Sequence, residues 1–131
     1  MGELAENQKT ADERPAETLE DLLEIIKTNL PTTNLDIVRK AYEFSEKAHA
    51  GQIRRSGEPY ISHPLGVAAI LANLRLDLPT IMTGLLHDTV EDTHVTLDEI
   101  ERSFGPTVAK LTDGVTKISR MKFRNTHEKQ G

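Results

Sequence analysis

The chain has 131 residues, a formal net charge of −5 and no cysteine. This length suits one domain with a single core, and the lack of cysteine excludes disulfides and thiolate metal sites. The negative charge argues against an obligate nucleic-acid-binding protein, and no apolar run is long enough to span a membrane. The N-terminus also lacks the pattern of a signal peptide, so we expect a cytoplasmic protein with no nucleic-acid or membrane partner.

Apolar spacing and scarce aromatic residues predict an all-α fold with an aliphatic core. Residues 1–14 are polar and without periodicity, so we expect a disordered or loosely attached tail there. A first helix is expected between Pro15 and Pro31, where apolar residues recur every three or four positions. A second begins near Asn34, and Gly51 is the expected C-cap.

Further helices are expected after a polar loop at 52–62. Thr96 and Glu99 form a capping-box pattern that opens a short helix, which ends before the next proline. The core faces of the third and last helices are expected to include Leu74 and Leu111. Proline is common at the first position of a helix, and we expect helices to begin at three prolines: Pro64, Pro79 and Pro106. The basic stretch that follows is expected to add no core element.

The sequence GLLHDTVEDTH contains an apolar run that leads directly into His87 and Asp88. At a helix end both side chains can reach one ion, and an imidazole with a carboxylate suits Mn²⁺, Fe²⁺ or Zn²⁺. Two ligands do not hold a catalytic metal, and His63 is the best candidate for a third. Glu91 and Asp92 follow one turn later and, if the helix continues, lie on the same side, where carboxylates can orient a water or move a proton.

Each of these signals alone has an ordinary explanation. Helix ends collect carboxylates, so Glu91 and Asp92 by themselves fit a solvated acid pair. His63 before a proline fits a capping residue, and Arg54-Arg55 fits a solvated basic pair. The remaining histidines are expected to have no special role: His49, His94 and His127.

Three segments together point to a family. RRSGEPYISHP, GLLHDTVEDT and FGPTVAKLTDGVTK resemble the N-terminal hydrolase domain of the RelA/SpoT family, which belongs to the HD superfamily of metal-dependent phosphohydrolases. The resemblance runs from Thr33 to Lys117. It implies removal of the 3′-pyrophosphate from guanosine tetra- or pentaphosphate (ppGpp or pppGpp), with GDP or GTP and pyrophosphate as products. It also implies Mn²⁺ as the cofactor.

The resemblance assigns a role to each matching residue near the His-Asp pair. Three of the family's metal ligands are matched by His63, His87 and Asp88. The family's catalytic acid pair is matched by Glu91 and Asp92.

The resemblance also assigns roles in the loop before His63. Arg54 matches an arginine that packs on the guanine ring, and Arg55 lies where a basic residue approaches the phosphates. Ser56 and Tyr60 match the loop that shapes the pocket. An acidic protein needs such a local positive region to attract a polyphosphate.

One family feature has no counterpart. The family's fourth metal ligand is an aspartate in an Asp-Arg-Leu-His-Asn type of motif, which does not occur between Asp92 and Gly131, and Asp113 lies in a different segment. We therefore expect residues 15–131 to be the N-terminal part of an HD hydrolase domain, with exposed apolar surface that favours self-association. Two alternatives remain open: a catalytically incomplete nucleotide-binding or regulatory domain, and an HD nucleotidase with another substrate.

Overall fold

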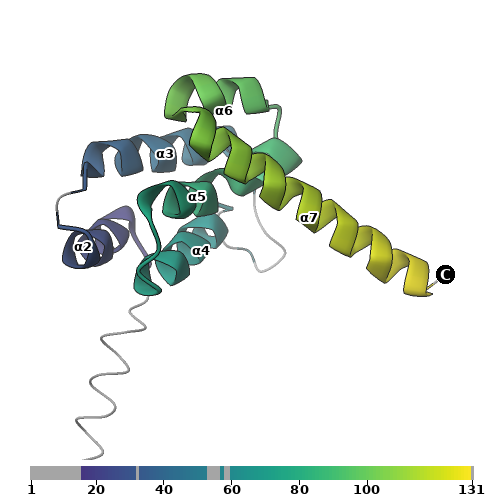
Figure 1. Ribbon diagram of the computed structural model, residues 1–131, viewed down its shortest axis with the longest axis horizontal. Helices are drawn as coiled ribbons and strands as arrows, with labels where there is room; N and C mark the ends of the chain where they lie inside the picture. The colour runs from purple at the N-terminus through teal and green to yellow at the C-terminus, as the bar shows by residue number, and fades with distance from the viewer. Residues whose placement is uncertain (1–15, 32, 53–56, 58–59, 131) are drawn as a thin grey trace, which may run out of the picture.

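The computed structural model describes residues 16–31, 33–52, 57 and 60–130, and Figure 1 shows their arrangement. Their regular structure is entirely helical, which confirms the all-α fold. The helices are α2 (Leu19–Asn29), α3 (Leu35–Ala48), α4 (Ser62–Asn73), α5 (Leu78–Asp92), α6 (Leu97–Phe104) and α7 (Pro106–Gln130). Within the described part of the chain, no helix has the length and apolar character needed to cross a membrane. The tail expected at 1–14 lies outside the described residues.

Side-chain caps begin three of the helices. The Thr18 hydroxyl accepts a hydrogen bond from the Asp21 N–H at 3.2 Å, and the Asp21 carboxylate accepts one from the Thr18 N–H at 3.2 Å. Asn34 caps α3 with its side-chain oxygen. Thr96 caps α6 by accepting from the Glu99 N–H at 3.2 Å, which confirms the predicted start of that helix.

Other helix boundaries differ from the expectation by one or two residues. Helix α4 begins two residues before Pro64, and α5 begins one residue before Pro79. Proline fits these positions equally well, because the N–H groups of the first turn have no intrahelical partner. The C-cap of α3 is His49, and Gly51 follows in a turn with φ +85°. Helix α7 is continuous and includes the whole basic stretch at 117–129.

Helix α5 lies at the centre of the fold. It packs against α3, α4 and α7, while α2 packs on α3 and α4, and α6 packs on α7 (Figure 1). The core is aliphatic, as expected. Leu74 and Leu111 are exceptions, since they are 63% and 38% exposed. Leu74 lies just beyond the end of α4, and Leu111 points away from the buried face of α7, which carries Val108, Thr112 and Thr116.

The contact between α4 and α5 is unusually close at Gly84. A Cβ atom at this position would lie 2.8 Å from Leu71 Cδ1 and 3.3 Å from the Ala68 Cα atom. A hydrogen atom is therefore the only side chain that fits without a shift of α4. This close approach brings the first turn of α4 beside the last turns of α5.

Candidate metal centre and acid pair

His63, His87 and Asp88 meet at one point between α4 and α5. One ligand atom from each residue lies within 4.8 Å of the other two. The Asp88 carboxylate is at the centre, with Oδ1 3.0 Å from His87 Nε2 and Oδ2 3.4 Å from His63 Nε2. The two imidazole rings are tilted by 59°, with centroids 6.0 Å apart. Two imidazole nitrogens and a carboxylate are a donor set that suits a divalent transition metal.

The helices fix the orientation of these side chains. His87 lies one turn after Gly84, and its Nδ1–H donates to the Gly84 carbonyl oxygen at 2.9 Å. Its Nε2 therefore faces Asp88. Histidine ligands of metals commonly use the second ring nitrogen in this way. His63 enters from the first turn of α4, so the centre depends on the α4–α5 contact.

Burial and charge act in opposite directions on the two central groups. Burial favours the neutral form of each. It would raise the pKa of the Asp88 carboxyl, which is 8% exposed, but the hydrogen bond from His87 and the nearby histidines lower that pKa below its ordinary value. For His87, burial lowers the pKa, and the contact with Asp88, the Gly84 carbonyl and Glu91 together raise it. In the metal-free chain these two pKa shifts favour an ion pair between His87 and Asp88.

One atom of this group lacks a conventional partner. Asp88 Oδ2 is fully buried and has no hydrogen-bond partner in the described part of the chain, because its contact with His63 Nε2 lacks hydrogen-bond geometry. A buried carboxylate oxygen without a donor is costly. A cation held by both histidines and Asp88 would satisfy it, so the three residues fit a metal ion.

Glu91 and Asp92 end the same helix. Helix α5 continues without a break to Asp92, and Glu91 is close enough to His87 to raise the pKa of that imidazole. This agrees with the prediction that the acids follow one turn after the His-Asp pair. The Asp92 carboxylate accepts a short hydrogen bond from the Tyr60 hydroxyl, and its backbone carbonyl accepts one from Gln52 Nε2 at 3.2 Å.

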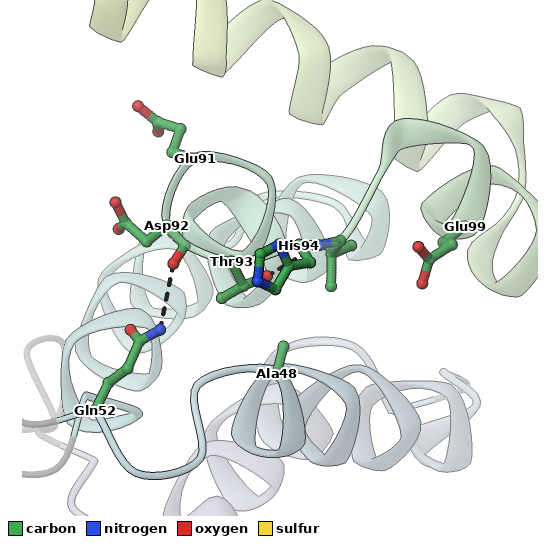
Figure 2. A pocket seen from close by; sticks show the side chains of 8 residues that line it. Ala48, Gln52, Glu91, Asp92, Thr93, His94 and Glu99 are labelled. Carbon is green, nitrogen blue, oxygen red and sulfur yellow. Dashed lines mark hydrogen bonds between the residues drawn. The ribbon is translucent and has the colours of Figure 1, made fainter.

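A pocket of about 520 Å³ lies beside the acid pair, between the ends of α3 and α5 and the start of α6. Figure 2 shows Glu91 and Asp92 at one edge of this pocket, with Gln52 reaching the Asp92 carbonyl from below. His94 lies near the middle of this view beside Thr93, and Glu99 lines the opposite side. None of the three candidate metal ligands lines it.

The expected substrate loop is described only in part. Arg54, Arg55 and Ser56 lie outside the described residues, whereas Tyr60 is described. His49 differs from the expectation, because it is 2% exposed and stacks on Tyr60 with ring centroids 4.4 Å apart. The sequence did contain a signal: His49 follows Ser45 by four residues, on the buried face of α3.

Comparison with known proteins identifies the family of this chain. Residues 41–131 match the family described as HD domain. The chain is 48% identical over 111 residues to the bifunctional (p)ppGpp synthase/hydrolase SpoT of Escherichia coli K12, a match that covers 85% of this chain and 16% of SpoT. The identity and coverage are the same for the guanosine-3′,5′-bis(diphosphate) 3′-pyrophosphohydrolase of Escherichia coli O157:H7. For the GTP pyrophosphokinase of Myxococcus xanthus the identity is 58% over 90 residues, covering 69% of this chain and 12% of the relative.

These matches confirm the resemblance to the RelA/SpoT family. They also show that the chain spans between 12% and 16% of the length of these relatives.

Proposed function

Because the chain belongs to the HD domain family, we propose that residues 15–131 form the N-terminal part of a metal-dependent hydrolase that acts on guanosine tetra- or pentaphosphate. In this reaction a water molecule attacks the 3′-pyrophosphate group, and GDP or GTP is released together with pyrophosphate. The names of the relatives support this substrate, since two of them describe this hydrolysis. The observation that carries the proposal is the convergence of His63, His87 and Asp88 within 4.8 Å.

We propose that these three residues hold Mn²⁺. The unsatisfied Asp88 Oδ2 and the two facing Nε2 atoms support the site. A bound divalent cation would activate a water and stabilise negative charge on phosphoryl oxygens. The role of the protein is to keep His87 in the tautomer set by Gly84 and to supply one negative charge, from Asp88, to the cation.

The acid pair would act beside that centre. Glu91 and Asp92 are on the last turn of α5, so helix geometry fixes their distance and rotation relative to His87 and Asp88. We propose that Glu91 takes a proton from the attacking water, or orients it, and that Asp92 assists at the leaving group. Both positions suit general acid–base chemistry, since Glu91 and Asp92 both line the pocket at the end of α5.

Substrate recognition is assigned to the loop between α3 and α4. Arg54 would stack on guanine, Arg55 would approach the phosphates, and Ser56 and Tyr60 would shape the pocket. Arginine suits these contacts because its planar cation stacks on rings and pairs with phosphate. We further propose a cytoplasmic location and the absence of nucleic-acid and membrane partners, in line with the net charge of −5.

The first test is hydrolysis of ppGpp by this chain with Mn²⁺, with GDP and pyrophosphate followed by anion-exchange chromatography. We expect turnover that His87→Ala abolishes. Glu91→Ala should also lose turnover but should bind Mn²⁺ as the unaltered chain does, because Glu91 is not one of the three ligands. Glu101→Ala is the matched control, since it removes an exposed glutamate from α6 and should leave turnover unchanged.

Three results would contradict the proposal. Equal hydrolysis of cyclic dinucleotides or deoxynucleoside triphosphates would favour a nucleotidase of broader specificity. Turnover that survives His87→Ala would exclude the proposed centre. Tight binding of ppGpp without any hydrolysis would favour a nucleotide-binding or regulatory domain.

A further inference from the structure

Asp92 accepts hydrogen bonds at its backbone carbonyl and at its carboxylate from groups outside its own helix. Gln52 Nε2 donates to the Asp92 backbone carbonyl at 3.2 Å, and the Tyr60 hydroxyl donates to the Asp92 carboxylate. Gln52 and Tyr60 flank the α3–α4 loop and are joined by a backbone hydrogen bond, from the Tyr60 N–H to the Gln52 carbonyl, at 3.3 Å. Both contacts therefore come from one structural unit.

His49 connects the two contacts. Its ring stacks on the Tyr60 ring with an interplanar angle of 13°, and its Nδ1 lies 3.2 Å from Gln52 Oε1. A backbone hydrogen bond of 2.9 Å, from the Gln52 N–H to the His49 carbonyl, fixes their relative position. Contacts thus run in a closed circle through His49, Gln52, Asp92 and Tyr60.

The Gln52 amide determines which nitrogen of His49 carries the proton. Its NH₂ group must face the Asp92 carbonyl, since a carbonyl oxygen only accepts. Its Oε1 consequently faces His49 and accepts from Nδ1–H. His49 Nε2 is buried and has no hydrogen-bond partner in the described part of the chain, so the ring is held by Nδ1 and by stacking alone.

We propose that His49, Gln52 and Tyr60 are positioning residues that hold the Asp92 carboxylate in its working orientation. This inference rests on the proposed function, because that function gives the Asp92 carboxylate its catalytic role. It adds that the Tyr60 hydroxyl contacts Asp92 in place of the nucleotide. Asp92 is at the last position of α5 and is solvent-exposed, so its own helix does little to restrict its rotamers. The hydrogen bond from the Tyr60 hydroxyl supplies that restriction at the carboxylate, and the bond from Gln52 to the backbone carbonyl holds the end of the helix.

The direct test does not require activity. The chain has two tyrosines, so ¹³Cζ-tyrosine labelling gives two NMR signals, and Tyr60→Phe identifies one of them. We expect Asp92→Asn and His49→Phe each to move the Tyr60 signal by more than its linewidth and to leave the Tyr42 signal unchanged. A Tyr60 signal that ignores both substitutions would overturn the proposal.

Kinetics then test the consequence for catalysis. Removing a hydrogen bond to a charged group should lower kcat by about ten- to a hundredfold in Tyr60→Phe, with little change in KM. His49→Ala should behave similarly. His49→Asn, which keeps a donor near Nδ1, and His49→Phe, which keeps the stack, should each recover part of the loss. Tyr42→Phe is the matched control and should retain full activity.

Two kinetic results would overturn the proposal. One is a kcat within about twofold of the unaltered chain in both Tyr60→Phe and His49→Ala, since a positioning contact must matter to the chemical step. The other is a loss of Mn²⁺ affinity that parallels the loss of kcat, which would place the effect at the metal centre. If the unaltered chain is itself inactive, the proposed function is contradicted. The NMR signal of Tyr60 would still show whether Tyr60 and His49 hold the Asp92 carboxylate.

Discussion

The close packing at Gly84 gives a quantitative prediction about stability. In a helix interior, Gly→Ala normally stabilises a protein by about 0.5–1 kcal/mol. At Gly84 the added methyl would meet Leu71 Cδ1 at 2.8 Å, which a rotamer change can relieve, and the Ala68 Cα at 3.3 Å, which only a shift of α4 can relieve. Overpacking of this kind costs about 1–3 kcal/mol. We therefore expect Gly84→Ala to destabilise the fold by about 1 kcal/mol.

Gly66→Ala in α4 is the matched control, because a Cβ there meets no atom within 4 Å. It should be more stable than the unaltered chain, so the two variants should differ by about 1–3 kcal/mol in urea unfolding followed by circular dichroism. The shift of α4 should also weaken Mn²⁺ binding in Gly84→Ala, because His63 moves with that helix. Equal stabilisation by both substitutions would refute the reasoning.

Two further predictions concern pH and association. Because the pKa of His87 is raised, His87 stabilises the metal-free fold below about pH 6.5, and this contribution is lost as pH rises through the folded pKa. Because the pKa of Asp88 is lowered, Asp88 stabilises the fold above about pH 3.9, and this contribution is lost as pH falls through the folded pKa. The pair therefore contributes most to stability between these two pH values. Urea unfolding in EDTA across this range should show the maximum, and Asp88→Asn should flatten it; an unchanged profile would contradict the ion pair. Self-association is the second expectation, because Ile118 and Met121 of α7 are 66% and 63% exposed. Ile118→Lys should weaken it in sedimentation velocity, whereas Ser119→Lys, which adds the same charge on a neighbouring exposed position, should not; a monomeric unaltered chain would refute this.

The order of the helices could be predicted because their signals are local. Apolar periodicity and the caps at Asn34 and Thr96 depend only on neighbouring residues, and the structure has helices in those places. The predicted starts at Pro64 and Pro79 are late by two residues and one residue, since proline is compatible with several first-turn positions. Leu111 was misplaced because the apolar pattern does not reveal which side of α7 has a partner.

The site was predictable to the extent that it lies on one helix. The spacing of His87, Asp88, Glu91 and Asp92 fixes their mutual geometry once α5 is known to continue. The approach of His63 depends on how α4 crosses α5, which no local pattern gives. The same holds for His49: helical spacing places it on the buried face, but its contacts arise from the return of the chain at Tyr60.

The position of His63 has a consequence for local motion. It lies in the first turn of α4, where the N-cap residue is Ile61, whose side chain cannot accept a hydrogen bond from the backbone. Such helix ends open readily and exchange their amide hydrogens quickly. A cation bound by His63 and by residues of α5 would hold this turn against the central helix. At a free cation concentration of a hundred times the dissociation constant, binding would add about 2.7 kcal/mol to the free energy of unfolding. Hydrogen exchange at the start of α4 would then report the local supply of metal, and the fold itself would depend on that supply.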